Sequence, residues 1–363
     1  LLGREAIRPN MAEVFDFISG KVILVTGGGG SIGSELVRQI FKTRPKTLIL
    51  FDIYENSTYD IQMELVRKMR EESIEDVELV TLIGSTYNEF RVEQVIKRYR
   101  PDYIYHAAAY KHVPMMENNP VEAVRNNVLG TRLMADMAVK YGVNRFVMVS
   151  TDKAVNPTNV MGATKRIAEI YTQSLNGRSN TLFITTRFGN VLGSNGSVIP
   201  RFKKQIEDGG PVTVTHPQIT RYFMTIPEAC QLVLEAGASG KGGEIFIFDM
   251  GESVKIVDLA KKMIKLSGLQ LGKDIQIVFT GLRPGEKLYE ELLANKENTI
   301  PTPHPQIMVA KVRKYDHDEA NSKIDGFIEL IKEQNNFKVV KLMKEIVPEF
   351  LSQNSIYEEL DKA

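Results

Sequence analysis

The sequence predicts an α/β fold: a Rossmann-type, doubly wound parallel sheet with a smaller α/β substrate domain on its C-terminal side. Three observations indicate this fold. Short β-branched and aliphatic runs alternate with helical patterns over the first half of the chain. A glycine-rich turn at residues 27–33 joins the first strand pattern to the first helical pattern. Asp52 ends the second strand pattern, where dinucleotide-binding folds place an acid.

The strands of the expected sheet are short apolar runs bounded by polar or turn residues. They lie at residues 21–26, 47–51, 78–83, 103–106, 145–149 and 181–187. Apolar residues recur at helical spacing within residues 33–40, 61–69, 90–99 and 120–141, and a further helical pattern starts near residue 162. Strands that alternate with helices of this length predict a parallel sheet.

The pattern changes after residue 187. Shorter strands at residues 212–215, 244–248 and 275–279 mix with helices at 227–236, 256–266 and 286–293, and two charged amphipathic helices follow at 321–333 and 337–351. We therefore expect a cofactor-binding domain over residues 1–190, with an N-terminal extension at 1–20. A substrate domain over 191–300 and a helical tail over 301–363 follow. The tail helices suit packing or oligomer contacts, and we expect a homodimer or higher homo-oligomer.

Composition narrows the class of protein. The chain has 363 residues and a net charge of +1, so its overall charge does not favour binding to nucleic acid or to an anionic membrane. Its single cysteine, Cys230, excludes an intramolecular disulfide framework and a cysteine-based metal site. Cys230 lies in an amphipathic helical pattern, where a small core residue is expected. We predict no metal site.

Membrane and targeting signals are not found in the sequence. No run of 18 apolar residues occurs, and no signal-peptide pattern opens the chain. We expect this segment to be cytoplasmic and to make no membrane contact. The chain begins with Leu1 rather than Met, so it is read as a piece of a longer protein. That parent could be anchored at the cytoplasmic face of the inner membrane.

The glycine turn has the spacing Gly27-x-x-Gly30-x-x-Gly33 between a strand and a helix. Such glycines allow a tight turn, close approach of the backbone to a diphosphate, and packing of the helix on the strand. The diphosphate would meet the helix N-terminus at Ser31 and Ile32. The Asp52 carboxylate would bind the adenosine ribose and repel a 2′-phosphate, which favours NAD over NADP. The alternative is an ordinary turn with a helix-capping Asp.

The end of the fourth strand pattern offers further contacts. Ala107 and Ala108 are small and would leave room for the ribose and nicotinamide. Lys111 and His112 follow in a loop, where they would either touch the substrate or be solvated. Asn126 and Asn127, which are polar within an apolar helical face, would either orient a catalytic lysine, bind ribose, or be satisfied by the backbone.

Polar side chains gather after the fifth strand pattern, where ligands bind in an open α/β sheet. They are Thr151, Asp152 and Lys153, followed at the start of a helix by Met161 and Lys165. Lys165 lies one helical turn after Met161 and would bind the nicotinamide ribose. Thr151 offers a hydroxyl to a substrate alcohol. Asp152 and Lys153 could act as general acid and general base, or form only a surface ion pair.

The second half of the chain carries its own polar cluster. Arginines among backbone-rich loops suit a diphosphate on the substrate, although each could instead form a structural ion pair. The expected substrate contacts are Asn190, Val198, Arg201, Thr213, Arg221, Arg283 and Glu286, together with Lys111.

Over residues 21–293 the chain resembles the extended short-chain dehydrogenase/reductase family, whose cofactor loop has this glycine spacing. Within that family it looks most like the nucleotide-sugar 4,6-dehydratases of bacterial polysaccharide and protein-glycan synthesis. The segments that carry the likeness are Ser-Thr-Asp-Lys-Ala-Val-Asn-Pro at 150–157, Tyr-Lys-His-Val-Pro at 110–114, Arg-Phe-Gly-Asn-Val at 187–191 and Arg-Pro-Gly-Glu-Lys at 283–287.

This resemblance implies UDP-N-acetylglucosamine as the substrate and tightly held NAD as the cofactor. It implies oxidation at C4, elimination of water across C5 and C6, and return of the hydride to C6. Asp152 would be the acid at the C6 hydroxyl and Lys153 the base at C5. Asn190, Arg221 and Arg283 would hold the UDP.

Two positions differ from most members of the family. Met161 stands where most have Tyr, and a thioether cannot take a proton from the C4 hydroxyl. That role would pass to another group, such as Asp152 acting through Thr151 or a water. The Met-x-x-x-Lys pattern resembles a membrane-anchored subgroup that retains the C5 configuration. Ser85 stands where many relatives carry an Asp that contacts adenine, so the adenine contact would be made by Ser85 instead.

Other functions on the same scaffold stay open. A nucleotide-sugar 4-epimerase needs the C4 redox step but has no use for the Asp152–Lys153 pair. A dehydratase that inverts C5 would keep the Tyr that Met161 replaces. A non-catalytic NAD-bound scaffold would explain the lost Tyr but not the retention of Asp152, Lys153 and Lys165 together.

Overall fold

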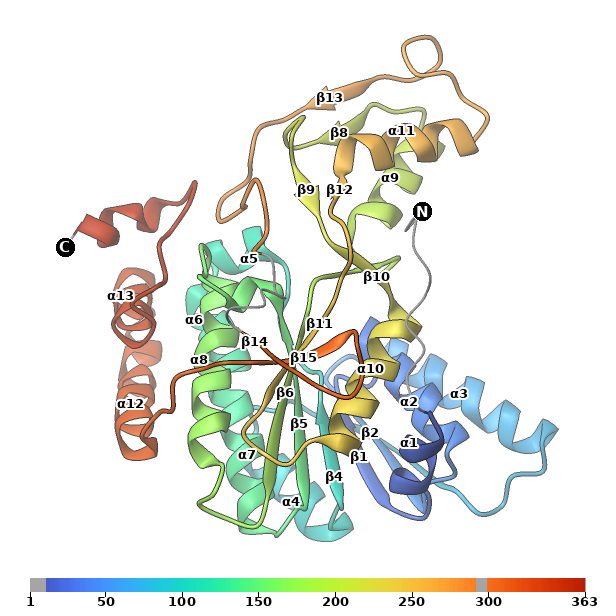
Figure 1. Cartoon of the computed structure of the whole chain (residues 1–363), viewed down its shortest axis with the longest axis vertical. Helices are drawn as coiled ribbons and strands as arrows, with labels where there is room; N and C mark the ends of the chain where they lie inside the picture. Colours follow the sequence, from blue (N-terminus) through green and yellow to red (C-terminus); the bar gives the residue numbers. More distant parts are fainter. Residues whose placement is uncertain (1–10, 292–298, 363) are drawn as a thin grey trace.

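The computed structural model describes residues 11–291 and 299–362. Within them, nine strands form one sheet in the order β14-β15-β11-β6-β5-β4-β1-β2-β3, with helices on both faces (Figure 1). Neighbouring strands from β11 to β3 are parallel, whereas β15 is antiparallel to both β11 and β14. This arrangement confirms the predicted Rossmann-type fold.

The strands of this sheet are apolar runs, as a sheet covered by helices on both faces requires. Their bounds are β1 (Val22–Thr26), β2 (Thr47–Asp52), β3 (Glu78–Ile83), β4 (Tyr103–His106), β5 (Arg145–Thr151), β6 (Leu182–Phe188), β11 (Ile245–Phe248), β14 (Thr299–Pro301) and β15 (Ile307–Ala310). The six strands predicted for the first half of the chain are all present.

Each face of the sheet has its own hydrophobic cluster. One face is covered by α1 (Met11–Ile18), α2 (Ser31–Lys42), α3 (Glu55–Glu71) and α10 (Ile226–Ser239). The other is covered by α4 (Glu89–Tyr99), α7 (Gly130–Lys140) and α8 (Val160–Leu175). Cys230 of α10 is fully buried in the first cluster, which confirms it as a small core residue.

A smaller lobe stands beyond the carboxyl ends of the main strands (Figure 1). It contains α9 (Val198–Glu207), α11 (Ile256–Leu266) and two short sheets, which pair β8 (Val212–Val214) with β13 (Ile277–Phe279) and β9 (Thr220–Arg221) with β12 (Val254–Lys255). These elements share a separate hydrophobic cluster. The strands β7 (Asn190–Leu192) and β10 (Phe223–Thr225) pair where the chain passes into and out of the lobe.

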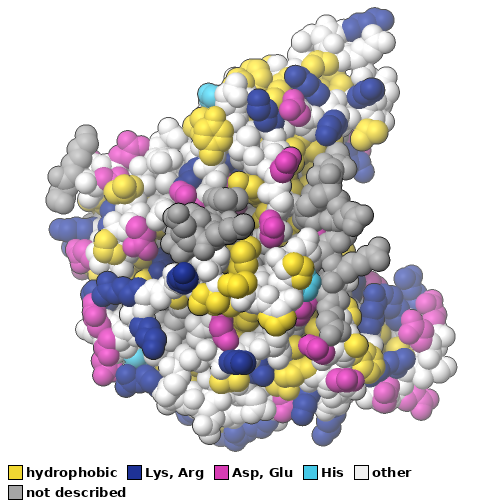
Figure 2. Space-filling model, in the orientation of Figure 1, with side chains coloured by type: hydrophobic (Ala, Val, Ile, Leu, Met, Phe, Trp, Pro, Cys, Tyr) yellow, Lys and Arg dark blue, Asp and Glu magenta, His cyan; other side chains and the backbone are white. Residues whose placement is uncertain are grey.

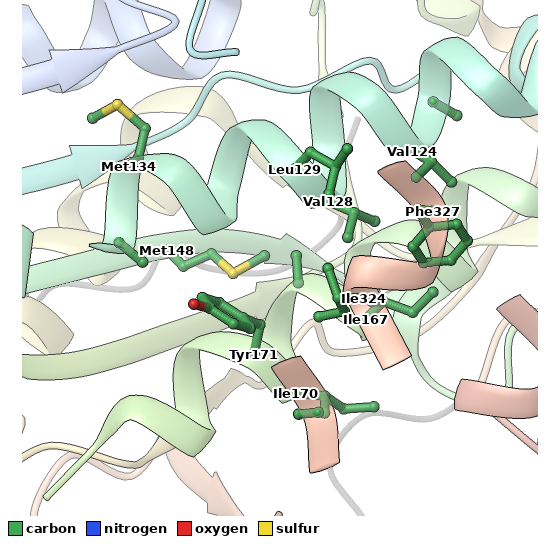
Figure 3. Close-up of a cluster of buried hydrophobic side chains, with 14 of the residues drawn as sticks. Val124, Val128, Leu129, Met134, Met148, Ile167, Ile170, Tyr171, Ile324 and Phe327 are labelled. Carbon is green, nitrogen blue, oxygen red and sulfur yellow. The ribbon is translucent and has the colours of Figure 1, made fainter. Parts of the chain in front are cut away.

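The tail helices α12 (His317–Glu333) and α13 (Asn336–Ile346) pack along α8 rather than standing free. Figure 3 shows Ile324 and Phe327 of α12 pointing towards Ile167 of α8. Arg132 Nη1 lies 2.7 Å from Asp325 Oδ1 and adds an ion pair between α7 and α12. The tail helices therefore act as packing elements of the main domain.

The structure departs from the expected elements in the second half of the chain. The strand predicted at 244–248 for the substrate domain is β11, and it pairs with β6 in the main sheet. The tail, expected to be helical, opens with β14 and β15 of the same sheet. No helix forms over residues 286–291, and the rest of that predicted helix lies outside the described residues. Residues 1–10 of the expected N-terminal extension also lie outside them.

The long helix predicted at 120–141 is interrupted. It consists of α6 (Pro120–Ala123), a π-helical turn at Val124–Leu129 and α7, with a further short helix, α5 (Val113–Asn118), before it. A π turn shifts the helical face by one residue. It places Asn127 in a fully buried position.

The surface carries mixed charge on the side shown in Figure 2, where basic and acidic side chains are interspersed. Among the helices of the described residues, none has both the length and the apolar character needed to cross a bilayer. No group of three or more His, Cys, Asp or Glu side chains in that part of the chain is placed to bind a metal ion.

Candidate active site

A cavity of about 850 Å³ lies where β1, β4, β5 and β6 end and the smaller lobe begins. Its size suits a drug-sized or larger ligand. Most of the residues predicted for the site line it. They are Gly27, Gly30, Ser31, Ile32, Gly33, Ala107, Lys111, Thr151, Lys153, Met161, Lys165, Asn190, Val198, Arg201, Thr213, Arg221, Arg283 and Glu286.

The glycine loop is shaped by close backbone contacts. Gly27 has a φ of 67°, and a Cβ there would lie 2.7 Å from the Ala108 nitrogen. A Cβ on Gly33 would overlap the carbonyl oxygen of Gly27, so the helix packs directly on the turn. No side chain caps the N-terminus of α2 at Gly30, and the first residues of this helix, Ser31 to Gly33, line the cavity. Loop and helix thus have the form of an anion-binding turn.

Four of the predicted residues do not line this cavity: Asp52, Ser85, Ala108 and Asp152. Asp52 Oδ2 accepts a hydrogen bond of 2.9 Å from the Gly29 N–H, and Oδ1 accepts one of 2.9 Å from the Tyr54 N–H. Ser85 Oγ accepts a hydrogen bond of 3.2 Å from the Tyr87 N–H. Asp52 and Ser85 therefore stand at the ends of β2 and β3 as predicted, where they order the loops beyond the cavity.

Asp152 lies behind the cavity wall and is 1% exposed. Its Oδ1 accepts hydrogen bonds from Thr151 Oγ1 at 2.9 Å and from Lys153 Nζ at 3.0 Å. Lys153 Nζ also donates to Asn190 Oδ1 at 3.1 Å. Burial alone would lower the pKa of Lys153, but the carboxylates of Asp152 and Glu290 outweigh it and raise the pKa. At rest Lys153 is therefore an ammonium ion.

Met161 and Lys165 project from the first turns of α8 into the cavity, and each is 4% exposed. Within the described part of the chain, no hydrogen bond to Lys165 Nζ is formed, so the amine is available to a ligand. Burial lowers the pKa of Lys165 to about 8, although the nearby Glu169 carboxylate opposes this. The pKa of Lys165 therefore lies about one pH unit above neutrality, so both the ammonium and the neutral amine are accessible near pH 7 to 8.

Glu169 supports this wall of the cavity from beneath. It is fully buried and accepts hydrogen bonds from Ser150 Oγ at 2.6 Å, Arg187 Nε at 2.8 Å and Arg166 Nη1 at 3.1 Å. Burial would raise the pKa of Glu169, but the two arginines more than offset this and lower it. The charged network joins the ends of β5 and β6 to α8, and so fixes Thr151 relative to Lys165.

Asn127 is satisfied by its surroundings. Its side chain accepts a hydrogen bond from the Tyr110 N–H at 2.8 Å and donates to the Tyr110 carbonyl at 2.9 Å and to Thr164 Oγ1 at 3.1 Å. Of the alternatives open for this residue, the structure favours a buried amide bound to backbone. It holds the start of the loop that carries Lys111.

Basic side chains gather at the lobe side of the cavity. They are Lys111, His112, Arg201 and Arg283. Burial lowers the pKa of Arg201, and the charge of Arg283 lowers it further. Burial also lowers the pKa of His112, with smaller contributions from Lys111 and Arg283. Mutual repulsion among these groups is relieved when an anion binds between them.

Arg221 differs from Arg201 and Arg283 in what it binds. Arg201 Nη2 donates to Thr213 Oγ1 at 2.6 Å and Arg283 Nη2 pairs with Glu286 Oε1 at 3.2 Å, whereas Arg221 is held mainly by backbone carbonyls. Its Nη2 donates to the Lys287 carbonyl at 2.9 Å and its Nη1 to the Thr220 carbonyl at 2.7 Å. Its Nε lies 3.5 Å from Glu290 Oε1. Arg221 therefore ties the segment after Arg283 to β9, although its side chain also reaches the cavity wall.

Sequence reasoning missed two features of the site. Glu290 lines the cavity with a side chain that is 3% exposed. It lies in a segment whose pattern predicted a helix, and such a pattern places a Glu in solvent. The loop around Asn195 was also missed. Its backbone N–H donates to Ser31 Oγ at 3.0 Å and so closes the lobe over the glycine loop.

Comparison with known proteins places the chain in a family. The family model described as "Polysaccharide biosynthesis protein" matches residues 23–312. The chain is 54% identical to the capsular polysaccharide biosynthesis protein CapD of Staphylococcus aureus over 351 residues, which cover 95% of this chain and 56% of CapD. It therefore spans little more than half the length of that relative.

Two further likenesses bear on the chemistry. The chain is 35% identical to the UDP-glucose 4-epimerase of Rickettsia canadensis, over 76% of this chain and 79% of that protein. Its structure resembles that of Pen from Bacillus thuringiensis with a TM-score of 0.71 and 34% identity, over 83% of this chain and 90% of Pen.

Proposed function

Because the chain belongs to the polysaccharide biosynthesis protein family, we propose that it is an NAD-dependent UDP-N-acetylglucosamine 4,6-dehydratase. The comparisons support the extended short-chain dehydrogenase/reductase family expected from the sequence. The proposed product is UDP-2-acetamido-2,6-dideoxy-xylo-hexos-4-ulose. The observation that carries the proposal is the chain of contacts from Thr151 to Asp152 to Lys153 at the cavity wall, because only an elimination needs both an acid and a base there.

The residues present suit NAD. The crowded turn at Gly27 and the uncapped N-terminus of α2 offer backbone N–H groups to a diphosphate. Ala107 leaves space beside them, and the Lys165 amine, which lines the same cavity, would bind the nicotinamide ribose. When bound there, NAD would supply a hydride acceptor for oxidation at C4 and a hydride donor for reduction at C6.

The lobe side of the cavity suits the UDP portion of the substrate. Arg201 and Arg283 bring two guanidinium groups to the wall, and Lys111 adds an amine whose pKa is lowered by burial. Arginine binds diphosphate oxygens in a bidentate way. Arg221 contributes less directly, because it holds the loop on which Arg283 stands.

Oxidation at C4 requires a group that takes the hydroxyl proton. Met161 cannot do so, because a thioether does not bind a proton near neutral pH. Thr151 faces the cavity and hydrogen-bonds to Asp152 behind it. We therefore assign the step to Thr151, which accepts the proton from C4 and passes its own to the Asp152 carboxylate.

We assign the elimination of water across C5 and C6 to Asp152 and Lys153. Lys153, as a neutral amine, takes the proton from C5, and Asp152 returns a proton through Thr151 to the departing C6 hydroxyl. The C6–O bond breaks, a C5–C6 double bond forms, and one water leaves. When C6 is reduced, Lys153 gives its proton to C5, so both side chains return to their starting states. Because Lys153 must begin as an amine, kcat should rise with pH.

The first test is incubation with UDP-N-acetylglucosamine followed by mass measurement. We expect a product lighter by one water. In the double variant Asp152→Asn with Lys153→Met, turnover should fall at least about 100-fold, while bound NAD is retained because the glycine loop is untouched. A wild-type rate in that variant would sink the mechanism.

The rival functions give different results in the same assay. An epimerase, favoured by the likeness to the Rickettsia enzyme, would leave the mass unchanged. A non-catalytic scaffold would bind NAD and convert nothing. The Met161-x-x-x-Lys165 pattern favours retention at C5, and NMR of the product formed in deuterated water tests this. An L-arabino product would show inversion instead.

A further inference from the structure

Glu290 is a buried carboxylate at the cavity wall that takes no part in the steps above. Its Oε1 lies 3.5 Å from Lys153 Nζ and 3.5 Å from Arg221 Nε. Its Oε2 is buried and makes no hydrogen bond to any residue that the structure describes. A buried carboxylate is strongly unfavourable unless neighbouring cations balance it. Lys153 and Arg221 supply that balance.

The Lys153 ammonium faces three acceptors, one for each of its N–H groups. Asp152 Oδ1 lies at 3.0 Å, Asn190 Oδ1 at 3.1 Å and Glu290 Oε1 at 3.5 Å. Asp152 belongs to the same short 3₁₀ helix as Lys153, so it moves with it. The contacts that fix the amine against the rest of the molecule are therefore those to Asn190 and Glu290.

We propose that Glu290 is a positioning residue for the elimination step, whose carboxylate holds the Lys153 amine in place and sets the charge on it. This rests on the proposed function, because it takes Lys153 as the group that removes the C5 proton. Glu290 touches no reacting atom and acts only through Lys153. Arg221 Nε lies 3.5 Å from the same oxygen, Glu290 Oε1, and so limits the movement of the carboxylate.

The charged groups that face Lys153 determine how it responds to a change at position 290. Asp152 and Glu290 favour its ammonium form, and Arg221 opposes it. Removing the charge of Glu290 leaves Asp152 and Arg221 acting in opposite directions, so the pKa of Lys153 falls. The neutral amine, which removes the C5 proton, is then present at lower pH.

The test compares the pH dependence of kcat for dehydration in the wild-type protein and in Glu290→Gln, Glu290→Asp and Glu291→Gln. In Glu290→Gln we expect the limb on which kcat rises to move to lower pH, and the upper plateau to fall by about 10- to 100-fold because the amine is misplaced. Glu290→Asp keeps the charge, so its limb should stay near the wild-type position while its plateau falls.

Glu291→Gln is the matched control, because the Glu291 side chain is 41% exposed and pairs with Lys287 at 3.3 Å. It should keep the wild-type profile. An unmoved limb and unchanged kcat in Glu290→Gln would overturn the role of Glu290, as would equal losses in both Gln variants. Folding of each variant is checked by its Tm and its bound NAD. If Glu290→Gln does not fold, the pH profile of Glu290→Asp decides. A shift of the pH range over which kcat rises in Glu290→Asp would overturn the proposal.

This outcome is separable from failure of the proposed function. If the wild-type protein releases no water from UDP-N-acetylglucosamine, the dehydratase assignment fails before any variant is compared. If the wild-type protein dehydrates the substrate and the Glu290 variants match it, only the role of Glu290 fails.

Discussion

At the scale of single residues, the site contains a buried amine, Lys165 Nζ, that makes no hydrogen bond to any residue in the described ranges 11–291 and 299–362. Lys165 is 4% exposed, and burial lowers its pKa from 10.5 to about 8. Between these two values the unfolded chain binds a proton that the folded chain does not, so stability rises with pH across this window. Below pH 8 the ammonium is present in both states, and its burial destabilises the fold in full.

We predict that Lys165→Met gains stability while it loses turnover. At pH 7, in protein freed of nucleotide, its free energy of unfolding should exceed that of the wild type by up to about 3 kcal/mol. The gain should shrink as the pH rises from 8 towards 10.5, as urea denaturation at several pH values would show. Lys261→Met, at a lysine that is 54% exposed, should change stability little. A gain in stability that does not vary with pH would contradict the lowered pKa of Lys165 as its cause.

Some residues of the site could be predicted from short stretches of sequence, and others could not. Thr151, Asp152, Lys153 and Lys165 lie in one strand–loop–helix stretch, so their meeting at the cavity follows from short-range pattern. The burial of Asp152 behind Thr151 does not, because it depends on Gly189, whose missing side chain lets Asp152 Oδ2 approach. The sequence around Glu290 gave no sign of its burial, since the cations that face it, Lys153 and Arg221, are distant in the chain.

At the scale of elements, the segment that ends the chain holds the loop of Arg283 against the loop before α8. The Gln353 carbonyl accepts a hydrogen bond of 2.9 Å from the Gly285 N–H, and the Gln353 N–H donates to the Thr158 carbonyl at 3.1 Å. Asn159 Nδ2 also donates to the Gly285 carbonyl at 3.1 Å. This junction joins the loop of Arg283 to the start of α8.

Gly285→Ala tests whether the junction matters for catalysis. Gly285 has a φ of 78°, and a Cβ there would lie 2.6 Å from the Asn159 Cβ; Gly281 has a φ of 86° and an open surrounding. Both Ala variants bear left-handed strain of about 1–2 kcal/mol, but only Gly285→Ala meets a clash. We expect it to lower kcat/KM about tenfold or more and Gly281→Ala to lower only Tm. Equal kinetics in the two variants would contradict this.

Elements with strong local periodicity were predictable, and those defined by long-range pairing were not. The strands β1 to β6 followed from apolar runs between turn residues. The apolar pattern of β11 would be the same in the main sheet and in the lobe. Only its pairing with β6 shows that it belongs to the main sheet. The π turn before α7 has no signature in apolar spacing, because one shifted residue still fits a helical pattern.

At the scale of the whole molecule, the chain crosses repeatedly between the main domain and the lobe. After entering the lobe at β7 it returns for α10 and β11, leaves again for α11 and β13, and returns for β14 and β15. The domain ranges expected from the sequence, with boundaries at residues 190 and 300, assign one continuous segment to each domain, whereas the chain enters each of them more than once. The consequence for function is that both lobes contribute to one cavity, so a ligand bound by one should stabilise contacts with the other.

This coupling predicts distinct hydrogen-exchange patterns for the two parts of the ligand set. Added to the NAD-bound protein, UDP should slow amide exchange in residues 194–202 and 283–288, which carry Arg201 and Arg283. Protection should extend to Ser31, because the Asn195 N–H donates to its hydroxyl and UDP holds that loop down. Arg201→Ala together with Arg283→Ala should abolish the UDP effect but leave residues 27–33 protected by NAD, since the glycine loop binds through its own backbone. UDP protection confined to residues 27–33, or unaltered in the double variant, would place the diphosphate elsewhere.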